Sequence, residues 1–283
     1  MLFDMDRAVL KKIPLRASPF AGWGQHFHHA IFALFLVQFV LIVFRLFQPA
    51  AFFGEARWPD AILLLLAAAA AVASATRQLP AQNVMLASII VAFIGGAAHS
   101  VGALTGIPFG PYVYTGQIGL QLFHPLPWAI PALWLSMVFT CRGVGRLILR
   151  PWRKTRNYGF WLMGITTALV VLFDLGLEPF ATQVKHFWLW HPTNAFVYWY
   201  SAPWVNFLGW AATTLVILAF ATPSLINKKS VKQPPDYYPL VLWLFLNGLF
   251  IAGAAAHQLW LAVVVVACAT MVATVFAIKG ARW

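Results

Sequence analysis

Acidic side chains are scarce in this chain: only seven of its 283 residues are Asp or Glu, and charged residues of all kinds make up 9%. Soluble domains carry about 25% charged residues, so the composition excludes a water-exposed globular surface. Hydrophobic residues make up 61%, and they form several stretches of about 20 residues, the length that crosses a bilayer core of about 30 Å. The sequence therefore predicts an all-α, polytopic membrane helix bundle.

Several catalytic signatures are also missing. There is no Walker phosphate loop, no dinucleotide-binding glycine motif and no nucleophile elbow. Cys141 and Cys268 lie in apolar stretches without a partner at a ligand spacing, which predicts neither a disulfide framework nor a metal site. His26, His28 and His29 cluster together, but the paired histidine boxes of a membrane di-iron enzyme are missing. We therefore expect no metal and no cofactor.

The basic residues support eight membrane crossings. The crossings are expected at residues 29–47, 59–76, 82–103, 128–149, 158–177, 202–222, 238–256 and 259–278. With a cytoplasmic N-terminus, 16 of the 19 Lys and Arg residues fall on the cytoplasmic side, which leaves Arg45, Arg57 and Lys185 outside. Both termini are therefore predicted to be cytoplasmic. The net charge of +12 is assigned to this topology and to anionic lipid, so no nucleic-acid partner is expected.

We predict a single integral membrane domain over residues 1–283, with a cytoplasmic segment at 1–27 and a helix bundle over 28–279. The first helix is expected to be retained, because no small-residue cleavage site follows its long apolar run. The expected location is the inner or plasma membrane of the cell. Two outer connections, 104–127 and 178–201, are nearly free of charge and rich in Pro, Gly and aromatic residues, which predicts that they fold down onto the bundle.

Asp174 and Glu178 close the fifth predicted crossing, and their spacing of four places both carboxyl groups on one helical face. His99 and Asp174 each lie about 16 residues into their crossings, so at about 1.5 Å per residue both are roughly 24 Å from the cytoplasmic edge. Asn206 and His257 are expected near the same depth. These polar groups could form one site. The alternatives are an interfacial carboxyl pair that anchors the helix end and a histidine that serves helix packing.

Aromatic residues crowd near the same depth, mainly in the two outer connections. An interfacial belt of Trp and Tyr explains several of them. Aromatic faces also stabilise a cation, by about 2 kcal/mol or more when it is desolvated. The members of this group that we assign to a site are Tyr112, Tyr114, Trp188, Trp190, Trp204 and Trp210.

Four segments in order resemble one family. The segment from Thr105 to Tyr114 reads TGIPFGPYVY, which resembles the signature of the carotenoid-biosynthesis membrane hydratases of the gamma-carotene 1',2'-hydratase and bisanhydrobacterioruberin hydratase type. Asp174 with Glu178-Pro179, then Trp188-x-Trp190, then the segment 203–210 with Asn206 also resemble it. The likeness covers about half the chain. His99 departs from the family, which usually has an acidic residue there.

The resemblance implies a hydratase, in the lyase class, that adds water to the terminal C=C bond of an acyclic carotenoid. Protonation gives a tertiary cation and water captures it, with no cofactor required. We assign Asp174 as the proton donor and Glu178 as its electrostatic partner, with His99 as a third catalytic candidate. The implied partners are the apolar polyene, water, membrane lipid and other carotenoid-biosynthesis enzymes. The substrate-binding candidates are Thr105, Pro108, Phe109, Tyr112, Tyr114, Trp188, Trp190, Trp204, Asn206 and Trp210.

Three other functions stay open from the sequence. A small-solute transporter also uses acids within the membrane, but it predicts polar residues through the whole membrane depth. A non-catalytic carotenoid- or isoprenoid-binding protein needs the same aromatic pocket. Another isoprenoid enzyme, such as a cyclase, shares the acid and cation chemistry.

Overall fold

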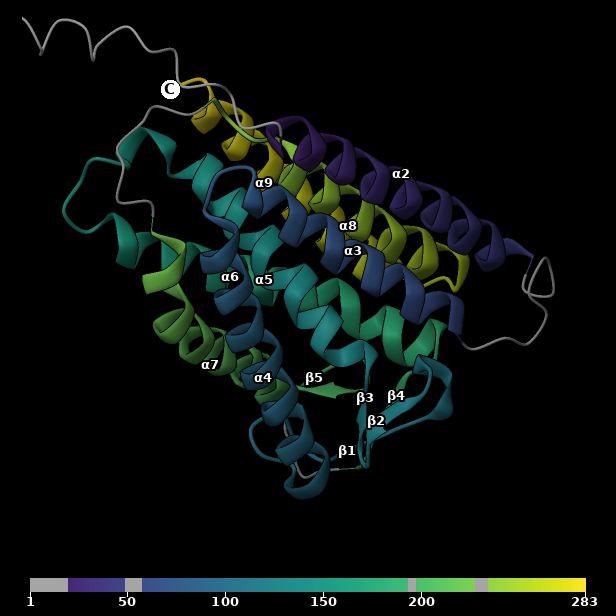
Figure 1. Cartoon of the computed structure of the whole chain (residues 1–283). Helices are drawn as coiled ribbons and strands as arrows, with labels where there is room; N and C mark the ends of the chain where they lie inside the picture. Colours follow the sequence, from purple (N-terminus) through teal and green to yellow (C-terminus); the bar gives the residue numbers. More distant parts are fainter. Residues whose placement is uncertain (1–19, 49–57, 193–196, 227–233) are drawn as a thin grey trace, which may run out of the picture.

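Eight long helices make up most of the described structure, a computed structural model that covers residues 20–48, 58–192, 197–226 and 234–283. Figure 1 shows them packed side by side as a bundle. The predicted all-α polytopic bundle is confirmed, and each predicted crossing overlaps one helix. The helices are α2 (Phe20–Phe47), α3 (Trp58–Thr76), α4 (Ala81–Thr105), α5 (Ala129–Ile148), α6 (Tyr158–Pro179), α7 (Trp204–Ala221), α8 (Tyr238–Ala256) and α9 (Trp260–Ala281).

Seven of these helices in the described part of the chain are long and apolar enough to cross a membrane, and α5 falls short. Helix α5 is less apolar than the others and lies inside the bundle: it packs against α3, α4, α6, α8 and α9, and most of its residues are buried. A helix surrounded by protein can carry polar groups that face the bundle interior. Arg142 on α5 is buried in this way and donates a hydrogen bond to the carbonyl oxygen of Leu225, at 2.7 Å.

Two ion pairs hold neighbouring elements together, one pair at each end of the bundle. Arg77, in the turn after α3, lies 3.4 Å from Asp236, just before α8. Lys185, just after α6, lies 2.8 Å from Asp60 in the first turn of α3. The described start of α2 and the C-terminus lie at the same end of the bundle as the turn between α3 and α4 (Figure 1), which agrees with the predicted alternation of crossings.

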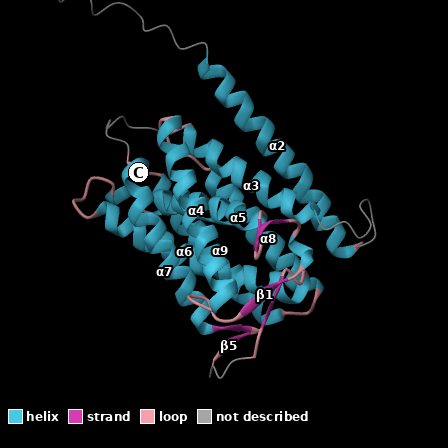
Figure 2. Ribbon diagram, turned by 60° about the horizontal axis from the view of Figure 1, so that its bottom comes forward, coloured by secondary structure: helices cyan, strands magenta, loops and turns pink. Residues whose placement is uncertain are grey.

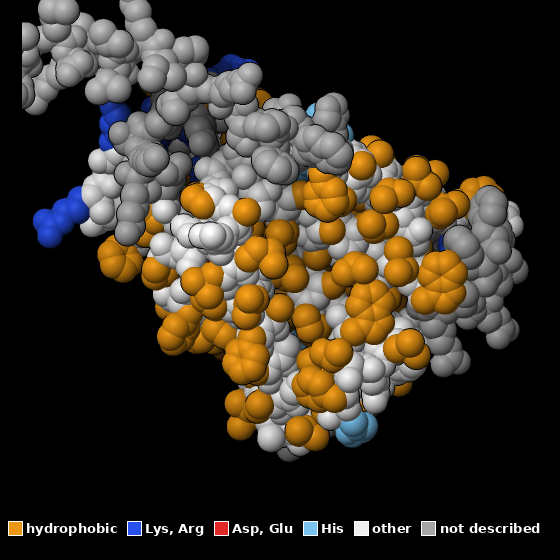
Figure 3. All heavy atoms as spheres, in the orientation of Figure 1, with side chains coloured by type: hydrophobic (Ala, Val, Ile, Leu, Met, Phe, Trp, Pro, Cys, Tyr) orange, Lys and Arg blue, Asp and Glu red, His pale blue; other side chains and the backbone are white. Residues whose placement is uncertain are grey.

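Basic side chains gather mainly at this same end, while hydrophobic side chains cover the rest of the face shown in Figure 3. The assignment of this end to the cytoplasm stays a prediction. Part of the charge pattern behind it lies outside the described residues, namely Arg7, Lys11, Lys12, Arg16, Arg57, Lys228, Lys229 and Lys232.

The two charge-poor connections fold onto the other end of the bundle, as predicted. They form three two-stranded antiparallel sheets, seen beside the helix ends in Figure 2. The strands are β1 (Tyr112–Tyr114) with β4 (Trp188–Trp190), β2 (Gln121–Phe123) with β3 (Leu126–Pro127), and β5 (Tyr198–Trp199) with β6 (Ala202–Pro203). The register of the first sheet places Tyr112 opposite Trp190 and Tyr114 opposite Trp188. This sheet joins the two connections, which are far apart in the sequence.

Short helical turns complete the chain. They are η2 (Gly116–Ile118), η3 (Arg150–Trp152), η4 (Phe180–Val184) and η5 (Thr222–Leu225). The regular α-helix of α6 ends at Pro179, and η4 continues it as a π-helical turn. π-Helical turns are rare in proteins, and those that occur often lie at functional sites.

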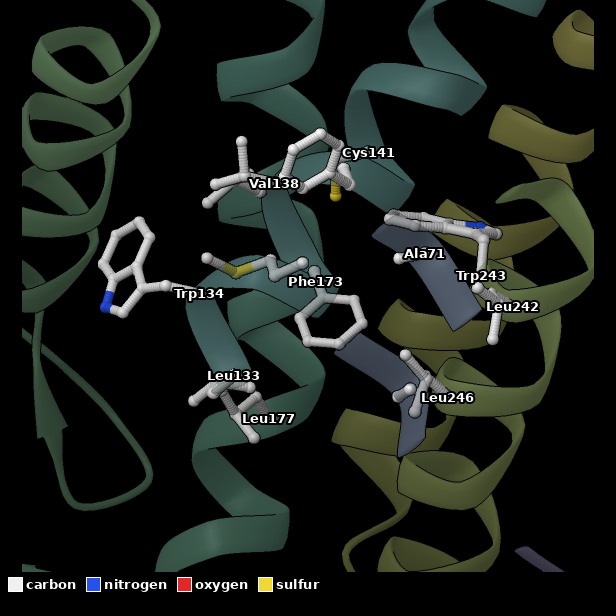
Figure 4. Packing of buried hydrophobic residues seen from close by; sticks show 14 of the residues in the cluster. Ala71, Leu133, Trp134, Val138, Cys141, Phe173, Leu177, Leu242, Trp243 and Leu246 are labelled. Atoms are coloured by element: carbon white, nitrogen blue, oxygen red, sulfur yellow. The ribbon is translucent and has the colours of Figure 1, made fainter. Parts of the chain in front are cut away.

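The core centres on α5. Figure 4 shows Leu133, Trp134 and Val138 of α5 near Phe173 of α6, with Trp243 and Leu246 of α8 on the far side. Helix α4 approaches this core closely through Gly95, where an added Cβ atom would lie 2.3 Å from the Trp134 ring.

Candidate active site

The two predicted carboxyl groups meet the predicted asparagine in one buried cluster. Asp174 and Glu178 lie in the last two turns of α6 and are 0% and 1% exposed. Asn206, in the first turns of α7, donates from Nδ2 to Asp174 Oδ2 at 2.9 Å and to Glu178 Oε1 at 3.0 Å. The amide group therefore bridges the two carboxyl groups.

Glu178 accepts more hydrogen bonds than Asp174 does. Trp188 and Trp190 are two residues apart on β4, so their side chains leave the strand on the same face. Both indole N–H groups donate to Glu178 Oε2, at 3.3 and 3.1 Å. With Asn206, Glu178 accepts three hydrogen bonds, whereas Asp174 Oδ1 is buried and has no partner among the described residues. The two carboxyl groups are thus chemically different.

His99 lies near this cluster, and hydrogen bonds to the two tyrosines of β1 hold its ring in place. Its Nδ1 is 2.7 Å from the Tyr114 hydroxyl and 3.0 Å from the Tyr112 hydroxyl, and Tyr112 also donates to the His99 carbonyl oxygen at 3.1 Å. Burial raises the pKa of Tyr112 and of Tyr114 above the ordinary value, so both phenols stay neutral. The other ring nitrogen, Nε2, is buried and has no partner in the described part of the chain.

Phe109 acts as a wedge between α4 and α7. An added Cβ atom on Gly102 of α4 would lie 2.8 Å from its ring, and one on Gly209 of α7 would lie 2.7 Å from it. Gly106 ends α4 in the left-handed conformation, with φ of 78°, which lets the chain turn back so that Phe109 stacks on His99 at 4.5 Å between ring centroids. Gly102 and Gly209 therefore make room for the Phe109 ring, and Gly106 allows the turn that places it.

A small cavity lies beside this cluster, and of the two carboxyl groups it is Glu178 that lines it. It has room for about one water molecule. The described residues include no group of three or more His, Cys, Asp or Glu that could hold a metal ion. The lining residues are His99, Phe109, Tyr112, Glu178, Trp188, Trp190 and Asn206.

Other predicted residues lie beside the cavity or away from it. Trp210 is buried behind His99, at 5.3 Å between ring centroids, and the backbone of Pro108 packs closely on α7 at Gly209. Thr105 is exposed and bonds to the carbonyl oxygen of Val101 within its own helix. Trp204 is 46% exposed and packs on Phe207. His257, expected near the site depth, bonds to the carbonyl oxygen of Gly253 at the end of α8.

Trp134 is a site neighbour that sequence reasoning missed. It stacks on Trp210 at 4.5 Å between ring centroids and lies 5.9 Å from the His99 ring. The indole nitrogens of Trp134 and Trp210 are both buried and have no hydrogen-bond partner among the described residues. Its helix, α5, carries no other site residue, so no motif indicated it.

Glu178, His99 and several aromatic side chains line a water-sized space, and Asp174 lies next to Glu178 through the Asn206 bridge. Such a set of groups can protonate an apolar ligand and supply a water molecule. No solved structure matches this chain. The bisanhydrobacterioruberin hydratase of Haloarcula japonica is 26% identical over 136 residues, which are 48% of this chain and 44% of that protein. The chain thus spans less than half the length of this relative. The family of carotenoid biosynthesis proteins matches residues 60–276, so this multi-pass membrane protein belongs to the carotenoid biosynthesis family.

Proposed function

We propose that this protein is a carotenoid hydratase, which adds water to the terminal C=C bond of an acyclic carotenoid end group. The observation that carries the proposal is the Asn206 bridge, which holds Asp174 and Glu178 together in a buried site beside an aromatic cavity. Membership of a carotenoid biosynthesis family and the name of the archaeal relative support the reaction class. We place the enzyme in the cell membrane, with lipid and other carotenoid-biosynthesis enzymes as its neighbours.

In the first step, Asp174 donates the proton. Three N–H donors around Glu178 favour a carboxylate at that position, because hydrogen bonds to the charged form stabilise it. Two neighbouring carboxylates in an apolar site disfavour each other, so the pair holds one proton, on Asp174. Asp174 lies behind the cavity lining, so the end group has to enter past Glu178 and Asn206 to reach it. Transfer of the proton from Oδ1, which has no other partner among the described residues, to the terminal alkene leaves a tertiary carbocation.

The cation is then stabilised by the groups that line the cavity. The Glu178 carboxylate supplies a fixed negative charge next to the cation, and the indole rings of Trp188 and Trp190 line the same cavity. Aromatic faces attract a cation, by about 2 kcal/mol or more when water is excluded. A charge that is already oriented in a buried site stabilises the intermediate without reorganisation.

His99 positions the water molecule and accepts a proton from it. When Nδ1–H donates to the Tyr114 hydroxyl, the unpartnered Nε2 becomes the acceptor. The water oxygen bonds to the tertiary carbon, and one of its protons moves to His99. Return of that proton to Asp174 restores the enzyme, so the net change is the addition of one water molecule.

Expression in a host that makes lycopene or gamma-carotene tests the function. The expected product is heavier by one water molecule, takes its oxygen from isotopically labelled water, and forms without molecular oxygen or a reductant. Unmodified, cyclised or desaturated carotenoids alone would contradict the proposal. Polyene that co-purifies unchanged would instead favour a non-catalytic binding protein.

A further inference from the structure

Four arginine residues form a cluster at the end of the bundle where basic side chains gather (Figure 3). Arg142 and Arg146 lie one turn apart on α5, Arg150 begins η3, and Arg153 follows η3 directly. Arg146 is within electrostatic range of both Arg142 and Arg150, and Arg150 is also within range of Arg153. Tyr158, at the start of α6, lies near Arg142 and Arg150. This arginine cluster therefore joins the end of α5 to the start of α6.

No carboxyl group in the described part of the chain pairs with Arg142 or Arg146. Arg142 is only 7% exposed, and it donates to the carbonyl oxygen of Leu225, which carries no net charge. Asp236 lies at the same end of the bundle, but its ion pair is with Arg77. A guanidinium group stays charged in proteins, so the cluster holds positive charge in a partly buried place. Burial of a charge without a counter-charge is costly.

The topology of the chain accounts for only part of this charge. The positive-inside rule explains exposed basic residues of a connection, such as Lys154 and Arg156. The C-terminal end of α5 also attracts positive charge, but its dipole is equivalent to only about half an elementary charge. Neither effect explains a buried arginine with further arginines close by, and residues 61–173 contain no Asp or Glu. Like charges one helical turn apart are destabilising, so the cluster favours an anion from outside the chain.

Exposed aromatic residues place the cluster at a membrane surface. Trp152, Phe160 and Trp161 are each more than half exposed, and they come from the same connection and from the first turn of α6. Tryptophan is enriched where the hydrocarbon core of a membrane meets water. The phosphate groups of lipids lie at this level, and arginine binds phosphate through paired N–H donors. Basic pockets between membrane helices are known sites for anionic head groups.

We propose that the arginine cluster and the Tyr158 hydroxyl bind the phosphate group of an anionic phospholipid, whose acyl chains lie beside Phe160 and Trp161. The phosphate supplies a negative charge next to Arg142 and Arg146, and the exposed aromatic side chains favour a lipid over a free phosphate ion. The predicted cytoplasmic location of this end agrees with the proposal, because the cytoplasmic leaflet carries anionic lipids. The inference is independent of the proposed hydration reaction.

The test measures lipid binding by the purified full-length protein in a neutral detergent. The protein is titrated with phosphatidylglycerol or with phosphatidylcholine, and bound lipid is measured by native mass spectrometry. We expect one phosphatidylglycerol to bind about tenfold more tightly or better, because the choline group brings a positive charge to the cluster. Equal affinities for the two lipids would overturn the inference. Displacement of phosphatidylglycerol by millimolar inorganic phosphate would show a site for a soluble anion, and would also overturn it.

Two matched variants separate a binding site from a general attraction to the connection. Arg146→Gln removes one charge from the cluster, and Arg156→Gln removes one from an exposed position nearby. We expect Arg146→Gln to weaken phosphatidylglycerol binding by about tenfold and Arg156→Gln to leave it unchanged. Equal losses in both variants, or no loss in a folded Arg146→Gln protein, would overturn the inference. If Arg146→Gln does not fold, Tyr158→Phe takes its place: weaker phosphatidylglycerol binding is expected, and unchanged affinity would overturn the inference.

Discussion

Replacement of Asp174 by Asn removes the proposed proton donor with little change in shape. Asp174 Oδ2 accepts a hydrogen bond from Asn206 at 2.9 Å, and the amide oxygen of a new asparagine can accept the same bond. The bridge to Glu178 therefore persists, and the variant should insert into the membrane and bind polyene normally. What it cannot do is release a proton to the alkene.

The expected loss of rate is large. Removal of a general acid costs about 10²–10⁴-fold, which corresponds to roughly 3–5 kcal/mol of activation free energy. The loss can exceed this range, because the carbocation does not form without a proton. Hydrated product per unit of membrane-inserted enzyme is the measurement, with bound polyene as the test of folding.

Glu178→Gln is the companion variant. Glu178 accepts three N–H groups over two oxygens, and a glutamine offers one amide oxygen in their place. We expect a protein with partial activity and lower stability, because at least one N–H donor then faces an NH₂ group. Near-normal turnover by Asp174→Asn, with a severe loss in Glu178→Gln, would refute the assignment and make Glu178 the donor.

Three further predictions concern packing, the histidine and topology. Gly209→Ala should lower stability by about 1–3 kcal/mol and reduce hydration, because its Cβ atom would lie 2.7 Å from the Phe109 ring. Gly164→Ala, with no atom within 4 Å, should leave hydration unchanged and not lower stability, because alanine favours a helix interior more than glycine does; a Gly209→Ala protein that melts at the wild-type temperature would contradict this. Tyr114→Phe removes the 2.7 Å hydrogen bond to His99 Nδ1 and should raise the activation free energy of water capture by about 1–3 kcal/mol, so full activity would exclude a role for this bond. Reporter fusions after residues 115 and 190 should report the outer side and those after 77 and 153 the cytoplasm; the opposite result would reverse the placement of the site.

The sequence by itself predicted the polytopic helix bundle, the approximate place of each long helix and the pairing of the acids. Hydropathy and charge are sums over neighbouring residues, so apolar stretches and basic loops can be read without the fold. The spacing of Asp174 and Glu178 is likewise a property of a single helix. It was enough to place both carboxyl groups on one face, although the protein around that face was unknown.

Only the tertiary structure decided which groups surround the acids. Asn206 and the two indoles reach Glu178 because α7 and β4 pack against the end of α6. Thr105 and Trp204 belong to the same motifs yet face away from the cavity. Trp134 had no local signal in the sequence. The physical reason is that the rotation of each helix about its axis, which sets its side-chain partners, is determined by packing between segments far apart in the sequence.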